Sequence, residues 1–462
     1  MKTIIKNGTV VSDTGMEKAD VLIEGETVSK VSAGISEEGA EIIDAEGKYV
    51  LPGAIDAHTH MDLDVGFARA CDSFHSGTVA AACGGTTTII DHMAFGPKGC
   101  YPSHQVKEYH KLADGEAVID YSFHGVLQEK ADENTLREMK EIAQSEGITS
   151  FKLYLTYDNM LKDKDVFAVL NEAKKDDILI TVHCENDGIV NYLRDLYGSE
   201  GKLTPSYHPK SRPAETEAEA VNRMLYMAEC AGEAPLYIVH LSSRAGLQEV
   251  LAARKRGQKH FGVETCPQYL FLDEKLYEDP KEGLKAVMSP PLRTERDREA
   301  LWNALSEDQL DTIATDHCPF TFGKQKQAGA SDFRKCPNGA PGVEERLLLL
   351  YTGGVKSGKI TLPQMVKYLS ANPARIFGIF PKKGLISPGA DADIVILDPN
   401  KTRVLSESNL HGNSDYTCYE GFTSEGDIEL VMQRGHIIVK DNEFLGNKGD
   451  GQYLKRGKSS LC

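Results

Sequence analysis

The spacing of apolar and polar residues changes twice along the chain. Residues 1–51 alternate in short apolar stretches separated by turn signals such as "KNGT" and "EGE", a pattern typical of half-buried β-strands. The same character returns in "ADADIVILDP" (390–399) and "DIELVMQRGHIIVKDNEFL" (427–445). Two strand-rich ends that flank a long middle segment predict one small β domain built from residues 1–51 together with 375–445.

In the middle segment, residues 52–374, apolar runs alternate with longer amphipathic stretches that are typical of helices. The stretch "DENTLREMKEIAQSEG", for example, opens with an acidic cap region and ends at Gly147, a common helix stop signal. This alternation predicts an α/β fold, a (β/α)8 barrel, and leaves 446–462 as a C-terminal tail. A doubly wound sheet is the alternative, but no G-x-G-x-x-G follows the first run. The eight runs are "GAIDAHTH", "TTTIIDHM", "AVIDYSFHGV", "ITSFKLYLTY", "ILITVHCEN", "PLYIVHLSS", "HFGVETCPQ" and "LDTIATDHC".

Composition narrows the class of protein without identifying it. With 40% hydrophobic and 26% charged residues, the chain has the make-up of an ordinary soluble globular protein. Its formal net charge of −17 argues against nucleic acid or an anionic membrane as a partner, because both need a basic surface. We expect a cytoplasmic protein, because neither a membrane span nor a signal peptide is evident and the ten cysteines are scattered without a C-x-x-C pair.

The candidate chemistry lies at the carboxyl ends of the apolar runs, where a barrel carries its active site. In "AIDAHTHMDLD", His58 and His60 are two positions apart, so in a strand both imidazoles point to one face. A pair of histidines can also simply open a surface loop, and a single histidine at a strand end is more often a hydrogen-bonded core residue. Four imidazoles and one carboxylate at neighbouring strand ends suit zinc or a similar divalent ion. These candidates are His58, His60, His183, His240 and Asp316.

Lys152 lies between Phe151 and Leu153 in the fourth run. A lysine inside such an apolar run is unusual and calls for a chemical explanation. A buried ammonium is costly, and burial lowers its own pKa. A neutral amine can take up carbon dioxide and become a carbamate, an anion whose two oxygens can bridge two metal ions. The alternative is a lysine that points to solvent or pairs with an acid; spacing alone leaves it open.

An ordered series of short motifs makes the chain resemble the amidohydrolase superfamily, in its hydantoinase and dihydropyrimidinase branch. The resemblance runs nearly end to end and includes "PARIFGIFPKKGLISPGADADIVILDP"; within the branch, "ARACDSF" and "AAACGGTTTIIDHMAFGPKGC" look most like the bacterial D-phenylhydantoinases. It implies a metal-dependent barrel, a bridging N6-carboxylysine and a β-sandwich formed by both termini. The motifs are "DAHTH", "SFKLYLTY", "TVHCEND", "YIVHLS", "ETCPQYL", "SPPLR", "ATDHCPF" and "PNGAPGVEER".

The resemblance also implies roles for individual residues. Two divalent ions, zinc first and manganese or another metal as alternatives, would hold a bridging hydroxide that attacks the substrate carbonyl. Asp316 would carry the proton to the leaving nitrogen, and Tyr157 would donate to the oxyanion. Ser289 and Asn338 would bind the amide edge of the ring through backbone groups. One ion would be held by His58, His60, Lys152 and Asp316, and the other by Lys152, His183 and His240.

Loops after the first, second and fourth runs are expected to shape the pocket for the ring substituent. The first two loops supply Phe67, Phe74, Phe95 and Tyr101, of which Phe67 and Phe95 are the candidate lining residues, although all four can instead pack the loops. Aromatic lining favours a bulky apolar substituent. We therefore expect hydrolysis of D-5-substituted aromatic hydantoins to N-carbamoyl-D-amino acids, with the stereospecificity resting on the resemblance alone.

Other functions remain open at this point. A dihydropyrimidinase acting on 5,6-dihydrouracil, or another cyclic ureide hydrolase, would use the same chemistry. A non-catalytic scaffold is a different class, which the branch also contains; it is less favoured because this chain keeps all six metal-site residues. The resemblance implies a homotetramer.

Overall fold

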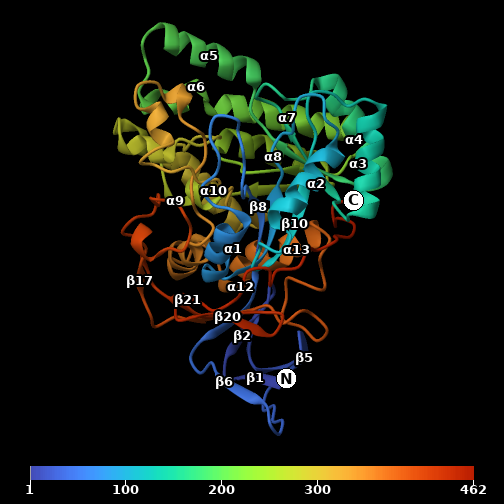
Figure 1. Ribbon diagram of the computed structural model, residues 1–462, viewed down its shortest axis with the longest axis vertical. Coiled ribbons are helices and arrows are strands. Elements are labelled where there is room, and N and C mark those ends of the chain that lie inside the picture. Colours follow the sequence, from blue (N-terminus) through green and yellow to red (C-terminus); the bar gives the residue numbers. More distant parts are fainter. Residues whose placement is uncertain (1) are drawn as a thin grey trace.

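Eight parallel strands form a barrel from the middle of the chain in the computed structural model, which describes residues 2–462 (Figure 1). The strands follow one another around the sheet in chain order, as short βα connections require. The circle closes where the first and last strands meet: Thr59 pairs with His317, and the His60 amide donates to the His317 carbonyl at 2.9 Å. The predicted barrel is confirmed. Its strands are β8 (Ala54–Thr59), β9 (Thr86–His92), β10 (Asp120–Val126), β11 (Ser150–Tyr154), β12 (Leu179–His183), β13 (Leu236–Ile238), β14 (Phe261–Thr265) and β15 (Thr312–Ile313).

Helices cover the barrel, and their ends follow local sequence signals. The Asp132 side chain accepts a hydrogen bond from the Thr135 amide at the start of α3, and Gly147, with φ +68°, turns the chain away after it. The helices between and after the barrel strands are α1 (Phe74–Cys83), α2 (Pro102–Ala113), α3 (Glu133–Ser145), α4 (Asp163–Asp176), α5 (Asp187–Ser199), α6 (His208–Ser211), α7 (Ala214–Cys230), α8 (Arg244–Arg256), α9 (Pro267–Phe271), α10 (Glu295–Ser306), α11 (Arg346–Leu350), α12 (Leu362–Val366) and α13 (Asn372–Ile376). Single turns or wider helical turns are η1 (Pro205–Tyr207), η2 (Glu274–Glu278), η3 (Glu282–Ala286), η4 (Lys326–Gly329), η5 (Phe333–Lys335), η6 (Tyr351–Lys356), η7 (Lys367–Ala371) and η8 (Glu407–Asn409).

Strands from both chain ends lie together at the lower end of the molecule in Figure 1, the blue N-terminal ones beside the red C-terminal ones. They form a four-stranded sheet in the order β5-β4-β1-β6 and a seven-stranded sheet in the order β21-β20-β19-β16-β7-β2-β3. Apolar side chains of both sheets, such as Val21 and Ile394, share one core cluster, as two packed sheets require. The prediction of a β domain built from both termini is confirmed. The strands are β1 (Lys2–Lys6), β2 (Thr9–Val11), β3 (Met16–Lys18), β4 (Asp20–Glu24), β5 (Thr27–Ser32), β6 (Glu41–Asp44), β7 (Tyr49–Pro52), β16 (Ile394–Asp398), β19 (Asp427–Gln433), β20 (His436–Lys440) and β21 (Glu443–Phe444), with β17 (Arg403–Val404) and β18 (Thr423–Ser424) pairing separately.

The last residues of the chain return to the barrel. The Leu454 amide donates to the Tyr121 carbonyl at 2.7 Å, and the Tyr121 amide donates to the Gln452 carbonyl at 3.0 Å. The buried Arg456 guanidinium donates to the Ser122 hydroxyl at 2.9 Å. The segment predicted as a tail is therefore packed along β10, while the exact domain boundaries stay a prediction.

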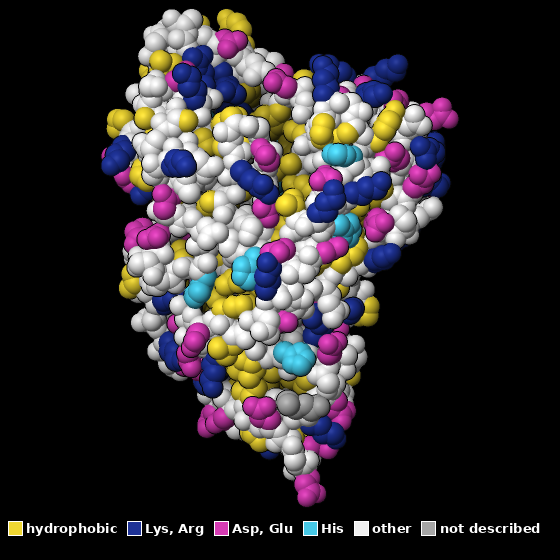
Figure 2. Space-filling view, viewed as in Figure 1, with side chains coloured by type: hydrophobic (Ala, Val, Ile, Leu, Met, Phe, Trp, Pro, Cys, Tyr) yellow, Lys and Arg dark blue, Asp and Glu magenta, His cyan; other side chains and the backbone are white. Residues whose placement is uncertain are grey.

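Charged side chains of both signs are interspersed over the face in Figure 2, without one dominant patch. Across residues 2–462, no helix combines the length and the apolar character that a membrane crossing requires.

Candidate metal centre

The six predicted metal-site residues lie at or near the carboxyl ends of five barrel strands. Lys152 is in β11 and His183 ends β12, whereas His240 and Asp316 follow β13 and β15 by two and three residues. His240 and Asp316 have φ values of 40° and 54°, a left-handed backbone that residues other than glycine rarely adopt and that often marks functional sites. Since parallel strands end at one rim, these side chains share the barrel mouth.

His58, His60 and Asp316 form the tightest cluster. The Nε2 atoms of His58 and His60 each lie 3.0 Å from the same carboxylate oxygen of Asp316. One ligand atom from each residue lies within 4.8 Å of the other two. Burial opposes ionisation of Asp316, but the two imidazoles outweigh it and hold the pKa of the carboxyl well below its usual range. Burial lowers the pKa of His60 to about 4, which keeps the ring neutral, as a metal ligand must be.

His183 and His240 form a second group beside the first. Nδ1 of His183 lies 2.9 Å from Nε2 of His240, and the His240 ring centroid is 5.4 Å from that of His58. Burial lowers the pKa of both rings, and the proximity of His183 lowers that of His240 further. Two neutral imidazoles with ring nitrogens 2.9 Å apart are close enough to bind one cation.

Lys152 is buried near both groups, with its ammonium 5.3 Å from the centre of the Tyr154 ring. Only 1% of the residue is exposed, and within residues 2–462 its ammonium makes no hydrogen bond or ion pair. Burial lowers the pKa of Lys152 to about 8. Burial is the main reason why the pKa values of His60 and His240 are low, and the positive charge of Lys152 lowers both further. The amine is therefore close enough to interact electrostatically with both groups. The alternative of a solvent-facing lysine does not describe this side chain.

Two buried carboxylates behind the histidines were not anticipated from the sequence. Nδ1 of His58 lies 2.7 Å from Glu264, which also accepts the His240 amide at 3.0 Å. Nε2 of His183 lies 2.8 Å from Glu185, which Arg212 binds at 2.5 Å. Such partners fix the ring orientation and the tautomer of metal-binding histidines. The available signals were a glutamate inside the apolar seventh run and one two positions after His183.

His92 at the end of β9 was also missed. Its ring centroid is 4.3 Å from that of His58 and 4.1 Å from that of His124, and both nitrogens are buried without a hydrogen-bond partner in the described chain. Burial lowers the pKa of His92 well below the ordinary value, so a neutral ring packs against the back of His58.

Tyr157 lies at the edge of this cluster. Its ring centroid is 5.5 Å from that of His183, and the Arg212 guanidinium lies 6.0 Å from its centre. Burial raises the pKa of the phenol, against the opposing effect of Arg212, so the hydroxyl keeps its proton and can donate. A hollow of about 480 Å³ opens beside Tyr157, with Lys98 and Met160 among its lining residues.

Ser289 lies next to Tyr157, and Asn338 is on a neighbouring segment. Within residues 2–462, the backbone N–H and C=O groups of Ser289 and Asn338 form no hydrogen bond. The carbonyls around Ser289 are all bound instead: Ala286 by the Tyr277 hydroxyl at 2.7 Å, Val287 by the Gly339 amide at 3.0 Å, Met288 by His208 at 2.7 Å and Pro290 by the Tyr269 hydroxyl at 2.8 Å.

The aromatic residues predicted for the substituent pocket separate into two groups. Phe95 contacts Tyr154 at 4.9 Å between ring centroids, and Tyr154 lies 5.9 Å from His183. Phe67 is at the tip of the turn closed by the Val65 amide and the Ala68 carbonyl, and it is 70% exposed.

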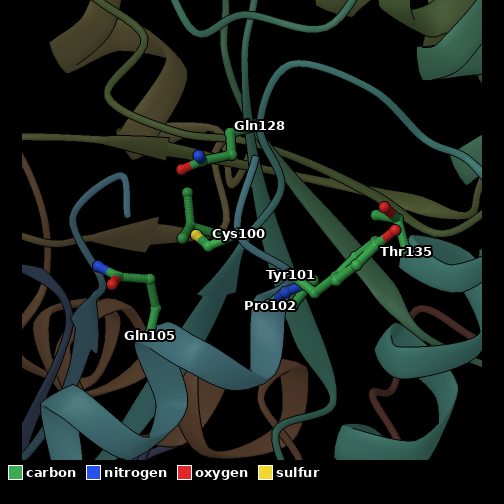
Figure 3. Close-up of a pocket in the computed structure, with 7 residues that line it drawn as sticks. Cys100, Tyr101, Pro102, Gln105, Gln128 and Thr135 are labelled. Atoms are coloured by element: carbon green, nitrogen blue, oxygen red, sulfur yellow. The ribbon is translucent and has the colours of Figure 1, made fainter. Parts of the chain in front are cut away.

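Phe74 and Tyr101, the other two aromatic residues of these loops, follow the alternative of packing between elements. Phe74 is the first residue of α1 and is fully buried in the core against Phe123, because the helix begins inside what the sequence suggested was loop. Tyr101 precedes α2, and its side chain points toward Thr135 of α3 (Figure 3), where the side-chain NH2 of Asn134 donates to its hydroxyl at 3.3 Å. Both side chains pack between elements.

The donor set fits a divalent metal ion. Nδ1 of His240 is buried without a hydrogen-bond partner in the part of the chain described, a costly condition that coordination would relieve. Imidazole and carboxylate ligands with buried carboxylates behind them are what zinc-type sites require.

Comparison with known proteins agrees with this chemistry. Residues 49–438 match the model of the amidohydrolase family. The chain is 48% identical to the D-phenylhydantoinase of Escherichia coli (strain K12) over 99% of its own length and 98% of the relative. It superposes on the crystal structure of dihydropyrimidinase from Brevibacillus agri NCHU1002 with a TM-score of 0.97, 42% identity and full coverage of both chains. An L-hydantoinase (dihydropyrimidinase) from Arthrobacter aurescens gives a TM-score of 0.90 at 30% identity, with 98% and 99% of the two chains covered. The chain is therefore an enzyme of the amidohydrolase family, a cyclic amide hydrolase of its hydantoinase and dihydropyrimidinase branch.

Proposed function

We propose that this enzyme opens the ring of D-5-substituted hydantoins, aromatic ones preferred, and releases N-carbamoyl-D-amino acids. The observation that carries the proposal is the meeting of four imidazoles, Asp316 and an unpaired buried Lys152 beside Tyr157 at one barrel mouth. The identity to bacterial D-phenylhydantoinases supports the substrate class and the D-configuration. A dihydropyrimidinase is the second candidate, because the Brevibacillus agri enzyme of nearly the same fold has that name.

Two divalent ions would be held in the mouth. His58, His60 and Asp316 would bind one and His183 with His240 the other, and Lys152 would bridge them as a carbamate. The carbamate forms when the neutral amine of Lys152 attacks carbon dioxide and loses one proton; a pKa of about 8 makes the neutral amine accessible near neutral pH. When bound, the metals would activate water and polarise the carbonyl that is attacked. Zinc is our first choice, with manganese as the alternative.

The side chains of this protein would then move the proton and hold the charge. Asp316 would accept the proton of the attacking water and deliver it to the ring nitrogen as the C–N bond breaks. The Tyr157 hydroxyl would donate to the oxygen that becomes negative. Glu264 and Glu185 would keep His58 and His183 in the required tautomer.

Recognition of the ring would use backbone rather than side chains. A cyclic imide or ureide presents N–H and C=O groups in alternation along one edge. The backbone N–H and C=O groups of Ser289 and Asn338, unpaired within residues 2–462, would supply the complementary donors and acceptors. Phe95, through its contact with Tyr154, and Phe67, from its exposed turn, would cover an apolar substituent.

A single comparison of rates tests the substrate. Purified enzyme loaded with zinc is assayed side by side with both phenylhydantoin enantiomers, dihydrouracil, allantoin and dihydroorotate. We expect the largest kcat/KM for D-phenylhydantoin. A larger value for dihydrouracil would replace this assignment by a dihydropyrimidinase, and no turnover of any substrate would favour a scaffold.

Metal dependence is tested separately. Chelation is expected to abolish turnover, and zinc or manganese to restore it, with about two ions per chain by elemental analysis. Full activity at less than one tenth of an ion per chain would contradict the metal site.

Assembly and location complete the proposal. The family relationship favours a homotetramer in the cytoplasm, with residues 1–51 and 375–445 as one domain, 52–374 as the catalytic barrel and 446–462 as a terminal segment. Sedimentation that gives a monomer at micromolar concentration would contradict the tetramer.

A further inference from the structure

Lys326 is a second fully buried lysine, far from Lys152 in sequence and outside the metal site. None of its surface is exposed, and no carboxylate within residues 2–462 pairs with it. Its ammonium donates to the Val287 carbonyl at 2.9 Å and to the Pro337 carbonyl at 3.2 Å. A buried ammonium without a counter-ion destabilises the folded protein, so a lysine at this position calls for a functional explanation.

The Val287 and Pro337 carbonyls that Lys326 binds indicate its role. Val287 is two residues before Ser289, and Pro337 is directly before Asn338. The Val287 carbonyl also accepts the Gly339 amide at 3.0 Å, so both segments converge on one oxygen and one ammonium. Gly339 has φ +145°, and a side chain there would collide with the Cys318 backbone at 2.2 Å, which fixes how closely the second segment approaches. Lys326 is thus the clamp between the two segments that carry the unpaired backbone groups.

We propose that Lys326 is a positioning residue for substrate recognition: it holds the Ser289 and Asn338 segments in the register that presents their free backbone groups to the amide edge of the ring. This inference rests on the proposed function, because the cyclic substrate proposed there is what these backbone groups would bind.

The charge of Lys326 adds to the geometry. An ammonium bound to the Pro337 carbonyl draws electron density from the Pro337–Asn338 peptide group, whose N–H belongs to Asn338. A hydrogen-bond acceptor polarised in this way makes the N–H of the same peptide a stronger donor, because hydrogen bonds in a chain reinforce one another in a low dielectric. A neutral side chain of equal length would keep the volume and lose this effect.

The test replaces Lys326 by Met, which fills a similar space without donors. We expect KM for phenylhydantoin to rise about 10- to 100-fold, the range for losing hydrogen bonds to a charged group, with kcat changed by less than about threefold. Metal content is expected to stay at the wild-type value. Hydrolysis of p-nitrophenyl acetate, an ester without an amide edge, is expected to keep the wild-type rate because the metal centre is untouched.

A matched control distinguishes positioning from general damage. Lys383 is also buried, at 2% exposed, but it is paired with three carboxylates away from the mouth. Lys383→Met is expected to lower the melting temperature and leave KM of the folded fraction unchanged. The milder Lys326→Gln, which keeps an N–H donor, is expected to recover part of the KM effect and serves if Lys326→Met does not fold.

Two outcomes would overturn the inference: an unchanged KM in both Lys326 variants, or an equal loss on the hydantoin and on the ester. Failure of the proposed function gives a different result, namely wild-type enzyme with a full complement of metal that turns over no hydantoin or dihydropyrimidine.

Discussion

Both ends of the barrel contain a buried lysine, but only the lysine at one end is neutralised by carboxylates. At the mouth, Lys152 has no hydrogen-bond or ion-pair partner, and Nδ1 of His60 and of His240 are unpaired in the described chain. At the opposite end, Lys383 lies 2.6 Å from Asp120 at the start of β10, and 2.9 and 2.7 Å from Asp391 and Asp393 of the β domain.

A buried arginine at the amino-terminal end is also held by hydrogen bonds. Arg346 is fully buried on the amino-terminal side, where it donates to the carbonyls of Ile55 and Ile313 at 3.0 and 2.9 Å and to the Thr86 hydroxyl at 3.0 Å. The buried lysine and arginine of the amino-terminal end are thus held by groups of the protein itself, whereas Lys152 at the mouth is left without such partners at a cost in stability. Substitutions at the two ends should therefore separate activity from folding.

The largest effect is expected at Lys152. Lys152→Ala should reduce hydantoin hydrolysis by more than about 100-fold, the upper value for losing even an outer partner of a metal ligand. Small carboxylates such as acetate, added with metal, should restore part of the rate by replacing the carbamate. For the metal-free protein the melting temperature should not fall, since there Lys152 is an unpaired buried amine. Wild-type activity without added carboxylate would remove the carbamate from the mechanism.

Lys383→Met should produce the opposite result. Three carboxylates would lose their shared partner, and we expect the free energy of unfolding to drop by about 3–5 kcal/mol. Urea titration followed by circular dichroism measures this change, and kcat/KM at low temperature should stay near the wild-type value. A loss of activity larger than the loss of folded protein would show that the two ends are coupled.

Glu264 sharpens the comparison within the mouth. Glu264→Gln keeps the shape but weakens the hold on Nδ1 of His58, so metal affinity should fall about 10- to 100-fold. Competition with a chromogenic chelator measures the affinity directly. Unchanged affinity would mean that His58 is oriented by packing against His92 alone.

The smallest effect is expected outside both ends. His411 lies 2.8 Å from Glu344, and this contact raises the pKa of the imidazole above its ordinary value. A raised folded-state pKa stabilises the protein fully below the unfolded pKa near 6.5, and the contribution disappears as pH rises through the folded-state pKa. His411→Gln should therefore lower stability by about 1 kcal/mol at pH 6 and by less at pH 9. Equal losses at both pH values would rule out the ionic contribution.

The parts that the sequence predicted are those encoded locally. The barrel follows from eight apolar runs in alternation with helices, and the ligands follow from polar residues at the ends of those runs. Even β15, only two residues long, lies within the predicted run "LDTIATDHC", in which Asp316 comes three residues after the strand ends.

Features that depend on distant contacts were not predictable. Glu264 meets His58 across 206 positions, and Lys326 meets Val287 across 39, with no periodicity that links the partners. The start of α1 at Phe74 was not predictable because the boundary between a loop and a helix depends on which residues the core accepts, which spacing does not reveal.

The way the barrel closes determines when the enzyme can mature. The Thr315 hydroxyl reaches the His58 carbonyl at 3.4 Å across 257 positions, and Asp316 reaches His60 at the same seam. During synthesis, the N-terminal histidines leave the ribosome long before their carboxylate partner exists. Loop closure of this length is slow and costly in chain entropy, so capture of a metal ion by this cluster is expected to be one of the last events in folding. Ribosome-bound chains that end before residue 312 should consequently fail to retain a metal ion at His58 and His60.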